Sequence, residues 1–406
     1  MTNQQPLTFL CISCYYKGVD FLKACKAAGN RVYLVTSKKL ENENWPKDQL
    51  DDIFYMNEDE NGEWNLNDLI AGTAFLFKNH QIDRVVALDD FDVEKAALVR
   101  ESFRIPGMGQ TTARYFRDKL AMRMKAQEEG IRVPGFSGLF NDELINQFIA
   151  EYPGPWVVKP RSEASATGIK KVHNGEELWQ HIHSLGEHRH EYLVEQFKPG
   201  DVYHVDSLSN NGKLIFCRVS QYLNTPFEVA HGGGVFLTHT VEFGSEDDKA
   251  LQAMTSEVMK GFGMQYSASH SEFIKCHEDG QFYFLETSSR VGGAHIAEMV
   301  TYSSGINLWS EWAKLETAVA KGEAYQLPTV KNDYAGLMVS LSRFEHPDHS
   351  VFNDPEVVWN IDKSYHVGVI MTSDRRERIL ELLNSYAERV FKDFHAAAPA
   401  PDKSTH

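Results

Sequence analysis

The stretch SEFIKCHEDGQFYFLETSSR, residues 271–290, contains the two acidic residues on which the fold assignment depends. Read as two antiparallel strands around a turn, it sets Glu272 directly opposite Glu286. Like charges in that position destabilise a sheet. The pairing is therefore favourable only if a cation lies between the two carboxylates.

The length of the loop decides whether these two acids share a face of the hairpin. A three-residue loop at Glu278–Asp279–Gly280 has glycine in the left-handed position that such loops need, and it pairs Ile274 with Phe284 and Glu272 with Glu286. A four-residue loop would shift the register by one and send the acids to opposite faces. The prediction of a joint site therefore requires an odd loop.

Two carboxylates on one face predict a hard cation that is bound together with phosphate. Oxygen ligands favour Mg²⁺ or Mn²⁺, which usually complete their coordination with water and phosphate oxygens. Side chains alternate along a strand, so Ser288 and Arg290 share the face of Glu286. Arginine offers the bidentate fork that suits phosphate. The alternative is a surface strand with scattered charges.

The composition is that of an ordinary globular protein. The chain has 406 residues, 42% of them hydrophobic and 24% charged, which allows two or three domains. The net charge of −16 argues against a general binder of nucleic acid or anionic membrane, because such proteins need a positive face. A local basic pocket could still bind an anionic substrate. No run of 18 apolar residues occurs, so no transmembrane helix is expected.

The cysteine pattern favours a reducing compartment. Among five cysteines, Cys11 and Cys14 form a single C-x-x-C inside the apolar run LTFLCISCYY. No second pair completes a zinc site, so buried strand thiols are expected, with redox or metal use as the alternative. The start of the chain lacks the basic region and cleavage site of a signal peptide. We therefore expect a cytoplasmic protein.

Strand and helix patterns alternate over the first hundred or so residues. LTFLCISC, RVYLVTS and IDRVVALD are typical of strands, and GVDFLKACKAAGN, NLNDLIAGTAFLFKNH and VEKAALVRESFR are typical of helices. This alternation predicts an α/β domain with a parallel sheet. The stretch TTARYFRDKLAMRMKAQEEG then predicts one long helix that ends at Gly130.

A second set of motifs lies between that helix and the acidic hairpin. PWVVKPRSEASATGIKKV indicates two strands joined by a loop of small residues, with Lys159 at the end of the first strand. A lysine is costly there unless it has a partner, and the backbone N–H groups of such a loop can bind phosphate. EYLVEQFKPGDVYHVD then gives a strand that ends at a Pro-Gly turn, and Asn211–Gly212 predicts a hairpin after it.

Taken in order, these motifs resemble those of the ATP-grasp superfamily over about residues 5–320. Lys119 and Lys159 resemble the two lysines that contact ATP phosphates in that family. Residues 195–197 are similar to its hinge, and Asp201 is similar to its ribose-binding acid. The lid loop departs from the glycine-rich form and resembles a variant seen among ATP-grasp ligases. The residues that the resemblance assigns to nucleotide binding are Lys119, Lys159, Ser162, Glu195, Gln196, Phe197 and Asp201.

The same resemblance covers the acidic hairpin. Glu272 and Glu286 match the two metal-binding acids of the family, and Arg290 matches its phosphate arginine. Ser288 stands where the family usually has asparagine, and a hydroxyl is a weaker ligand for a second metal ion.

The resemblance implies an α/β fold, with α+β character in the nucleotide domain, and three familiar parts followed by a C-terminal segment. We expect an N-terminal parallel-sheet preATP-grasp-like domain at 1–115 and a lid subdomain with its lead-in helix at 116–197. We expect a catalytic antiparallel-sheet subdomain at 198–325 and a C-terminal α/β segment at 326–395. The tail, 396–406, has the composition of a disordered segment.

The activity that the resemblance implies is ATP-dependent ligation, as in the L-amino acid ligase-like branch. ATP phosphorylates a substrate carboxylate, and an amine captures the acyl phosphate to give an amide or peptide bond, ADP and phosphate. Mg²⁺ (or Mn²⁺), Lys159 and Arg290 would stabilise the charge that develops during transfer. The expected partners are a small-molecule carboxylate and an amine, with no nucleic acid and no membrane, and a homodimer is common for such folds.

Two other functions stay open. A biotin-carboxylase-like enzyme would phosphorylate bicarbonate, and that family follows its phosphate arginine with R-x-Q-V-E-H-P-V-T-E. Here RVGGAHIAEMV keeps His295 but has Ala294 where the catalytic base belongs. A non-catalytic ATP-binding protein is the second alternative, although the two metal acids argue against it.

Two glycine-containing stretches are candidates for the substrate site. In TPFEVAHGGGVFLTHT, His231, Gly233 and Glu228 could contact the substrate, and a flexible surface loop is the alternative. In GGAH, His295 could line the same pocket, because it closely follows the phosphate arginine.

Overall fold

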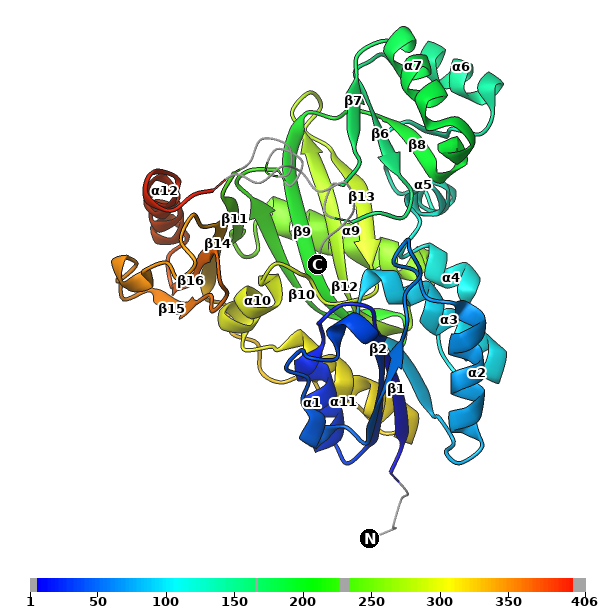
Figure 1. The fold of residues 1–406 in the computed structure, drawn as a ribbon. Coiled ribbons are helices and arrows are strands. Elements are labelled where there is room, and N and C mark those ends of the chain that lie inside the picture. The colour runs from blue at the N-terminus through cyan, green and yellow to red at the C-terminus, as the bar shows by residue number, and fades with distance from the viewer. Residues whose placement is uncertain (1–5, 165–166, 226–228, 230–233, 397–406) are drawn as a thin grey trace.

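The computed structural model describes residues 6–396 except 165–166, 226–228 and 230–233. Within these residues the strands form three sheets, one parallel and two antiparallel (Figure 1). No helix in this part of the chain is both long and apolar enough to cross a membrane. The predicted tail lies almost entirely outside the described residues.

The N-terminal sheet is parallel, as predicted, and has the strand order β3-β2-β1-β4. Helix α1 packs on one face of it, and α2 and α3 pack on the other (Figure 1). β3 was not identified from the sequence, although its residues DIFYM are mostly apolar; it is a partly exposed strand at the edge of the sheet. Cys11 and Cys14 are buried thiols, as expected. The elements are β1 (Thr8–Ser13), α1 (Val19–Ala27), β2 (Arg31–Ser37), β3 (Asp52–Met56), α2 (Leu66–Phe77), β4 (Arg84–Ala87) and α3 (Val93–Phe103).

The prediction of one long helix after this domain is wrong. The segment contains two helices, α4 (Gln110–Arg114) and α5 (Lys119–Glu128). Asp118 breaks the run because its backbone is extended and its carboxylate accepts hydrogen bonds from the N–H groups of Leu120 and Ala121, as an N-cap does. The predicted stop at Gly130 is confirmed by its left-handed backbone, with φ of 72°.

The lid is a four-stranded antiparallel sheet with the order β5-β8-β6-β7. Two helices cover one of its faces and share an apolar core with it, at the upper right of Figure 1. The elements are β5 (Phe136–Gly138), α6 (Asp142–Glu151), β6 (Trp156–Pro160), β7 (Lys170–Val172), α7 (Gly175–Leu185) and β8 (Tyr192–Gln196).

The largest sheet has eight antiparallel strands in the order β13-β12-β9-β10-β11-β14-β16-β15. Asn211 and Gly212 both have positive φ, which confirms the predicted turn between β9 and β10. The boundary proposed at 325 falls inside this sheet, because β14–β16 extend it. The strands are β9 (Gly200–Asn210), β10 (Lys213–Tyr222), β11 (Phe236–Thr240), β12 (Tyr266–Cys276), β13 (Phe282–Ser288), β14 (Tyr334–Leu341), β15 (Val357–Asn360) and β16 (His366–Ser373).

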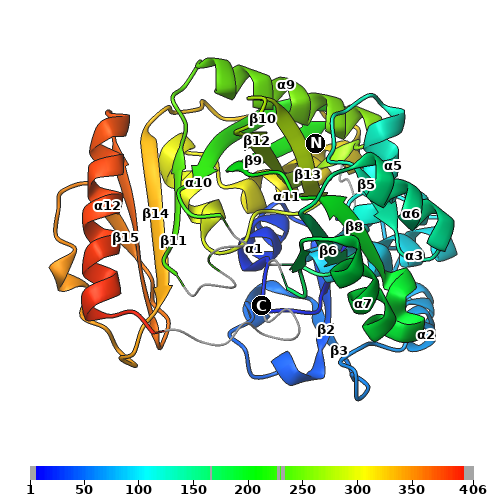
Figure 2. The same ribbon diagram turned by 90° about the horizontal axis from the view of Figure 1, so that it is seen from above.

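Helices cover both faces of the large sheet. α9 (Glu246–Gly261) packs on one face, and α10 (Ile296–Ser304) and α11 (Leu308–Lys321) pack on the other, together with the N-terminal domain (Figure 2). α12 (Arg376–Asp393) packs against β11, β14 and β16. The face that carries α10 and α11 is also the face on which the two acids of the hairpin lie.

Candidate active site

The hairpin pairs Glu272 with Glu286, as predicted, but the register nearer the turn differs from the prediction. The N–H of Cys276 donates to the carbonyl of Gln281, so the loop has four residues, 277–280, rather than three. Ile274 accordingly pairs with Tyr283 and not with Phe284. Without a further irregularity, this even loop would place the two acids on opposite faces.

A β-bulge at Leu285 restores the pairing. The register shifts between Glu272 and Phe273, so β13 contributes one extra residue at this point. Phe284 lies in the core beneath α9, whereas Tyr283 and Leu285 pack against the core on the opposite face. The bulge places Glu286 on the same face of the hairpin as Glu272. The prediction had explained this shared face by a loop with an odd number of residues.

Each of the two acids already has a cationic or hydrogen-bonding neighbour. Glu272 Oε1 accepts a hydrogen bond of 2.8 Å from the Tyr222 hydroxyl and lies 3.6 Å from His270 Nε2. Glu286 Oε2 lies 2.8 Å from Lys119 Nζ. Burial tends to raise the pKa of Glu272, but His270 and Tyr222 outweigh it and lower that pKa. The two acids therefore face a site that attracts positive charge.

Lys119 and Lys159 are both held by acceptors of the protein itself. Besides Glu286, Lys119 Nζ donates to the Glu163 carbonyl at 2.6 Å. Lys159 Nζ lies 2.6 Å from Glu195 Oε2. Glu195 is 1% exposed, and although burial tends to raise its pKa, Arg123 and Lys159 lower it to about 2. The side chain of Glu195 is thus an internal counter-ion for Arg123 and Lys159.

The remaining hinge residues use their backbone within the lid. The N–H of Gln196 donates to the carbonyl of Gly135 at 2.8 Å, and the N–H of Phe197 donates to that of Pro155 at 3.0 Å. Lys171 Nζ lies 3.7 Å from the centroid of the Phe197 ring, in a cation–π contact. These N–H groups are therefore committed to holding the strand that leads out of the lid.

Asp201 does not lie on the face of the two acids. It pairs with Lys275, whereas Glu272 pairs with His204 on the same strand, β9. Because 201 and 204 differ by an odd number, their side chains point to opposite faces of the sheet. The carboxylate of Asp201 lies 3.3 Å from His277 Nε2 instead.

The lid loop is fastened to the start of α5. Ser162 lies in the turn after β6, next to Arg161. The carbonyl of Arg161 accepts a hydrogen bond of 2.9 Å from the N–H of Lys119, and its guanidinium forms an ion pair with Asp118. Ser162 and Lys119 thus lie on segments that are joined directly.

Arg290 is 8% exposed and makes an ion pair with Asp90 of the N-terminal domain. Its Nε donates to Asp90 Oδ2 at 2.9 Å, its Nη2 donates to the same oxygen, and its Nη1 donates to the Val291 carbonyl at 2.9 Å. Burial tends to raise the pKa of Asp90, but Arg290 holds it well below its usual range, and Ser288 acts in the same direction. Ser288 and Arg290 thus meet at one carboxylate.

Asp90 was not predicted, although the sequence contains a signal for it. Residues 89–92 read DDFD and begin at the last residue of the strand pattern IDRVVALD. The carboxyl ends of parallel strands are where α/β sheets place their functional groups. Asp89, Asp90 and Asp92 are all buried.

A buried group formed by His204, Asp206 and His270 was also not predicted from the sequence. The motifs HVD at 204–206 and HSE at 270–272 place alternating polar residues on single strand faces, which was the available signal. Burial tends to lower the pKa of His270, but the carboxylates of Asp206 and Glu272 raise it to about 10. The ring next to Glu272 is therefore cationic at neutral pH.

Of the substrate candidates, His295 lies in an unusual stretch of backbone. Ala294 and His295 both have positive φ, 51° and 64°, just before α10. Such conformations cost energy and concentrate at functional sites. The ring of His295 lies 4.7 Å from that of Trp359 on β15. His231, Gly233 and Glu228 lie outside the described residues.

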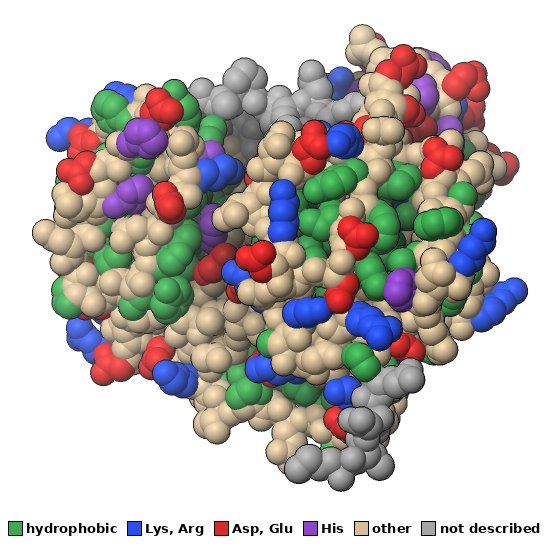
Figure 3. Space-filling model, turned by 60° about the horizontal axis from the view of Figure 1, so that its bottom comes forward, with side chains coloured by type: hydrophobic (Ala, Val, Ile, Leu, Met, Phe, Trp, Pro, Cys, Tyr) green, Lys and Arg blue, Asp and Glu red, His purple; other side chains and the backbone are tan. Residues whose placement is uncertain are grey.

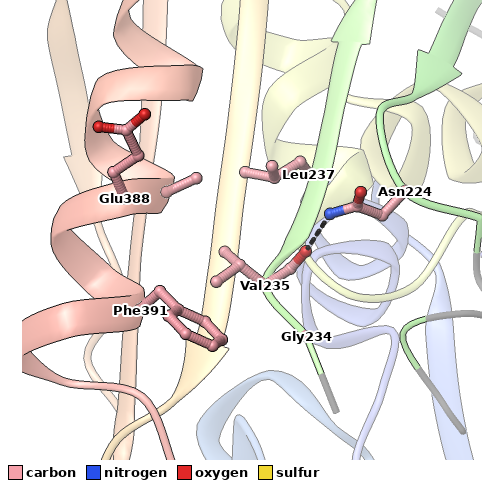
Figure 4. A pocket seen from close by; sticks show the side chains of 7 residues that line it. Asn224, Gly234, Val235, Leu237, Glu388 and Phe391 are labelled. Atoms are coloured by element: carbon pink, nitrogen blue, oxygen red, sulfur yellow. Dashed lines mark hydrogen bonds between the residues drawn. The ribbon is translucent and has the colours of Figure 1, made fainter. Parts of the chain in front are cut away.

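A cavity of about 440 Å³ lies elsewhere, between β11 and α12 (Figure 4). It contains none of the described candidate residues. Its lining consists of Asn224, Gly234, Val235, Leu237, Ala387, Glu388 and Phe391.

The face of the molecule in Figure 3 carries basic and acidic side chains interspersed with one another.

Comparison with known proteins covers part of this site. A model of the ATP-grasp domain family matches residues 152–298, which include Lys159, the hinge and the whole acidic hairpin. The chain contains an ATP-grasp domain. Residues 195–197, the bulged hairpin and Arg290 thus all lie within the matched residues.

Relatives and structures extend the comparison beyond that domain. The chain is 25% identical over 244 residues to an L-arginine-specific L-amino acid ligase of Bacillus subtilis, a match that covers 58% of this chain and 57% of that protein. The crystal structure of an L-amino acid ligase from Bacillus licheniformis is similar over 97% of this chain and 98% of that one, with a TM-score of 0.76 and 17% identity.

The fold of this chain is also similar to that of a carboxylase. The biotin carboxylase domain of the Hydrogenobacter thermophilus 2-oxoglutarate carboxylase, a dimer in complex with MgADP, ADP and bicarbonate, is similar over 97% of this chain and 91% of that one. Its TM-score is 0.71 and its identity 14%. At this level of identity, the likeness shows the fold alone.

Proposed function

We propose that this protein is an ATP-dependent ligase that activates a carboxylate as an acyl phosphate and joins it to an amine, releasing ADP and phosphate. The observation that carries the proposal is the bulged hairpin, which sets Glu272 and Glu286 face to face beside Lys119. The similarity to L-amino acid ligases supports amino acids as the substrates and a dipeptide as the product.

The residues present fit a hard divalent cation. Glu272 and Glu286 offer carboxylate oxygens, and the side chain of Glu286 is 32% exposed, so a ligand can reach it. Oxygen donors of this kind suit Mg²⁺ or Mn²⁺. When bound, the cation would neutralise charge on the transferred phosphoryl group.

Cationic side chains of the protein would bind the phosphates and stabilise the developing charge. Lys119 and Lys159 would bind phosphate oxygens in place of their present carboxylate partners, and Arg290 would stabilise the developing charge on the acyl phosphate. Asp90 holds the guanidinium of Arg290 by two of its nitrogens, which fixes its plane. Phosphoryl transfer depends mainly on such positioning and electrostatics.

ADP release tests the activity directly. Pairs of amino acids, and small carboxylic acids with amines, would be screened with ATP and Mg²⁺, with bicarbonate alone as a separate arm. ADP release that requires both partners supports the ligase, and release with bicarbonate alone supports a carboxylase instead. Glu286→Gln should lower the rate by about 100-fold, as expected for removal of one group that stabilises the transition state. Glu278→Gln, an exposed acid in the same hairpin, is the matched control.

We also infer a homodimer, because the biotin carboxylase domain of the same fold is described as one. Light scattering on the purified chain would measure its mass. A mass of a single chain across the micromolar range would contradict the dimer without bearing on the ligase.

A further inference from the structure

The group formed by His204, Asp206 and His270 lies directly behind Glu272. Asp206 is fully buried and bridges two histidines: its Oδ2 is 2.7 Å from His204 Nδ1, and its Oδ1 is 2.9 Å from His270 Nδ1. On its other side, the His204 ring forms a hydrogen bond of 2.8 Å between Nε2 and the Thr238 hydroxyl. These contacts join β9, β11 and β12 inside the sheet's packed face.

The spacing of this group is that of hydrogen bonds rather than of metal ligands. Around a tetrahedral zinc ion with bonds of about 2.0 Å, neighbouring donor atoms lie roughly 3.3 Å apart. Here the donor and acceptor atoms lie 2.7 and 2.9 Å apart. A carboxylate only accepts hydrogen bonds, so both Nδ1 atoms carry the hydrogen that Asp206 receives.

The orientation of His270 determines what Glu272 can do. With Nδ1 held by Asp206, the Nε2 edge of His270 faces Glu272 Oε1 at 3.6 Å. The Tyr222 hydroxyl contacts the same oxygen at 2.8 Å. Both of these contacts go to Oε1, so Oε2 is the oxygen that remains for a ligand.

The backbone after Arg290 closes over this group. A Cβ placed on Gly292 would lie 2.5 Å from Asp206 Oδ1 and 3.1 Å from His270 Nδ1. Gly292 has an ordinary φ, so its substitution acts through this contact and not through backbone strain. The segment that follows the phosphate arginine thus packs on the Asp206–His270 hydrogen bond itself.

We propose that Asp206 is a positioning residue for the metal site: it fixes the His270 ring, which holds one oxygen of Glu272 inward and presents the other to a divalent cation. Residues behind a ligand that fix its orientation typically change metal affinity by 10- to 100-fold when they are altered. The proposal rests on the proposed function, because it assumes that Glu272 binds a cation together with nucleotide.

Manganese binding tests it without any measurement of activity. The affinity of the purified chain for Mn²⁺ in the presence of ADP would be measured from the EPR signal of free Mn²⁺. Asp206→Asn should weaken that affinity by about 10-fold or more. Ser207→Ala is the matched control, because Ser207 is the next residue, is equally buried and bonds to Ser269 on the other face of the sheet.

A second variant keeps the proposal testable if Asp206→Asn does not fold. Gly292→Ala should weaken Mn²⁺ binding in the same direction, since it displaces the same hydrogen bond. Wild-type Mn²⁺ affinity in a folded Asp206→Asn or Gly292→Ala chain would overturn the positioning role, as would stoichiometric zinc in the purified protein. Failure of the wild-type chain to bind Mn²⁺ with ADP would instead overturn the proposed function, and this inference with it.

Discussion

Glu195→Gln should weaken the lid, because it removes the counter-ion of a buried arginine. Arg123 is fully buried, and its Nε lies 2.5 Å from Glu195 Oε1. Among the residues that the structure describes, Glu195 is the only acid paired with Arg123.

The size of the effect follows from burial. Removing one partner of a buried ion pair costs about 3–5 kcal/mol, because the other charge stays uncompensated. The Lys159 side chain is 14% exposed and can turn toward water, so the lower figure applies. About 3 kcal/mol corresponds to roughly a 150-fold change in an opening equilibrium. Arg123→Met combined with Glu195→Gln should recover most of the loss, because the double variant leaves no buried arginine charge.

Hydrogen exchange of β6 and β8 measures this local stability. In Glu195→Gln, the slowest amides of 156–160 and 192–196 should exchange about 100-fold faster than in the wild type. Glu129→Gln is the control: it breaks an exposed pair with Lys125 at the end of α5, worth about 0.5 kcal/mol or less. Exchange within twofold of the wild type, or a double variant no better than the single one, would refute the reasoning.

The same residue predicts acid sensitivity of the lid. Burial tends to raise the pKa of Glu195, but Arg123 and Lys159 lower it to about 2 in the folded chain, below its ordinary value near 4.5. Its contribution is therefore complete above pH 4.5 and is lost as the pH falls toward 2. Lid exchange in the wild type should accelerate over this window, and Glu195→Gln should remove that dependence.

Three further outcomes follow from single residues. Gly280→Ala, at φ of 67°, should destabilise the chain by about 1 kcal/mol in urea unfolding, whereas Gly293→Ala, which meets no atom within 4 Å, should not. Burial lowers the pKa of His239 to about 4, so wild-type stability should fall as the pH drops from 6.5 to 4, and His239→Asn should flatten that fall. Asp90→Asn should slow ADP release by on the order of 100-fold through misplacement of Arg290; an unchanged rate would separate Asp90 from the chemistry.

The hairpin shows how far a local pattern can be trusted. The sequence predicted that Glu272 and Glu286 share a face, but it did so through a loop of the wrong length. The bulge at Leu285 was not visible, because residues 282–285 read FYFL and have no polar residue to mark a face. Which of these side chains enters which core is decided by α9 and by the N-terminal domain, and so by tertiary packing.

The helix break at Asp118 and the buried histidines differ in how far the sequence alone could predict them. Asp118 before KLAM is an N-cap signal, so the start of α5 could have been predicted. The contact between Asp206 and His270 spans 64 positions and depends on the pairing of β9 with β12. Alternation gives the face of each strand, but only the register brings the two strands together.

Two ion pairs around the site explain how an acidic protein can receive an anionic nucleotide. Lys119 lies against Glu286, and Arg290 pairs with Asp90. Under the proposed function, phosphate would replace Glu286 at Lys119, and a divalent cation would replace Lys119 at Glu286. Each charge keeps a partner of opposite sign throughout this exchange, so no group is desolvated alone, which is the costly step for buried charges. Arg290 differs, because Asp90 uses only part of its fork and can remain in place while the free N–H groups bind phosphate.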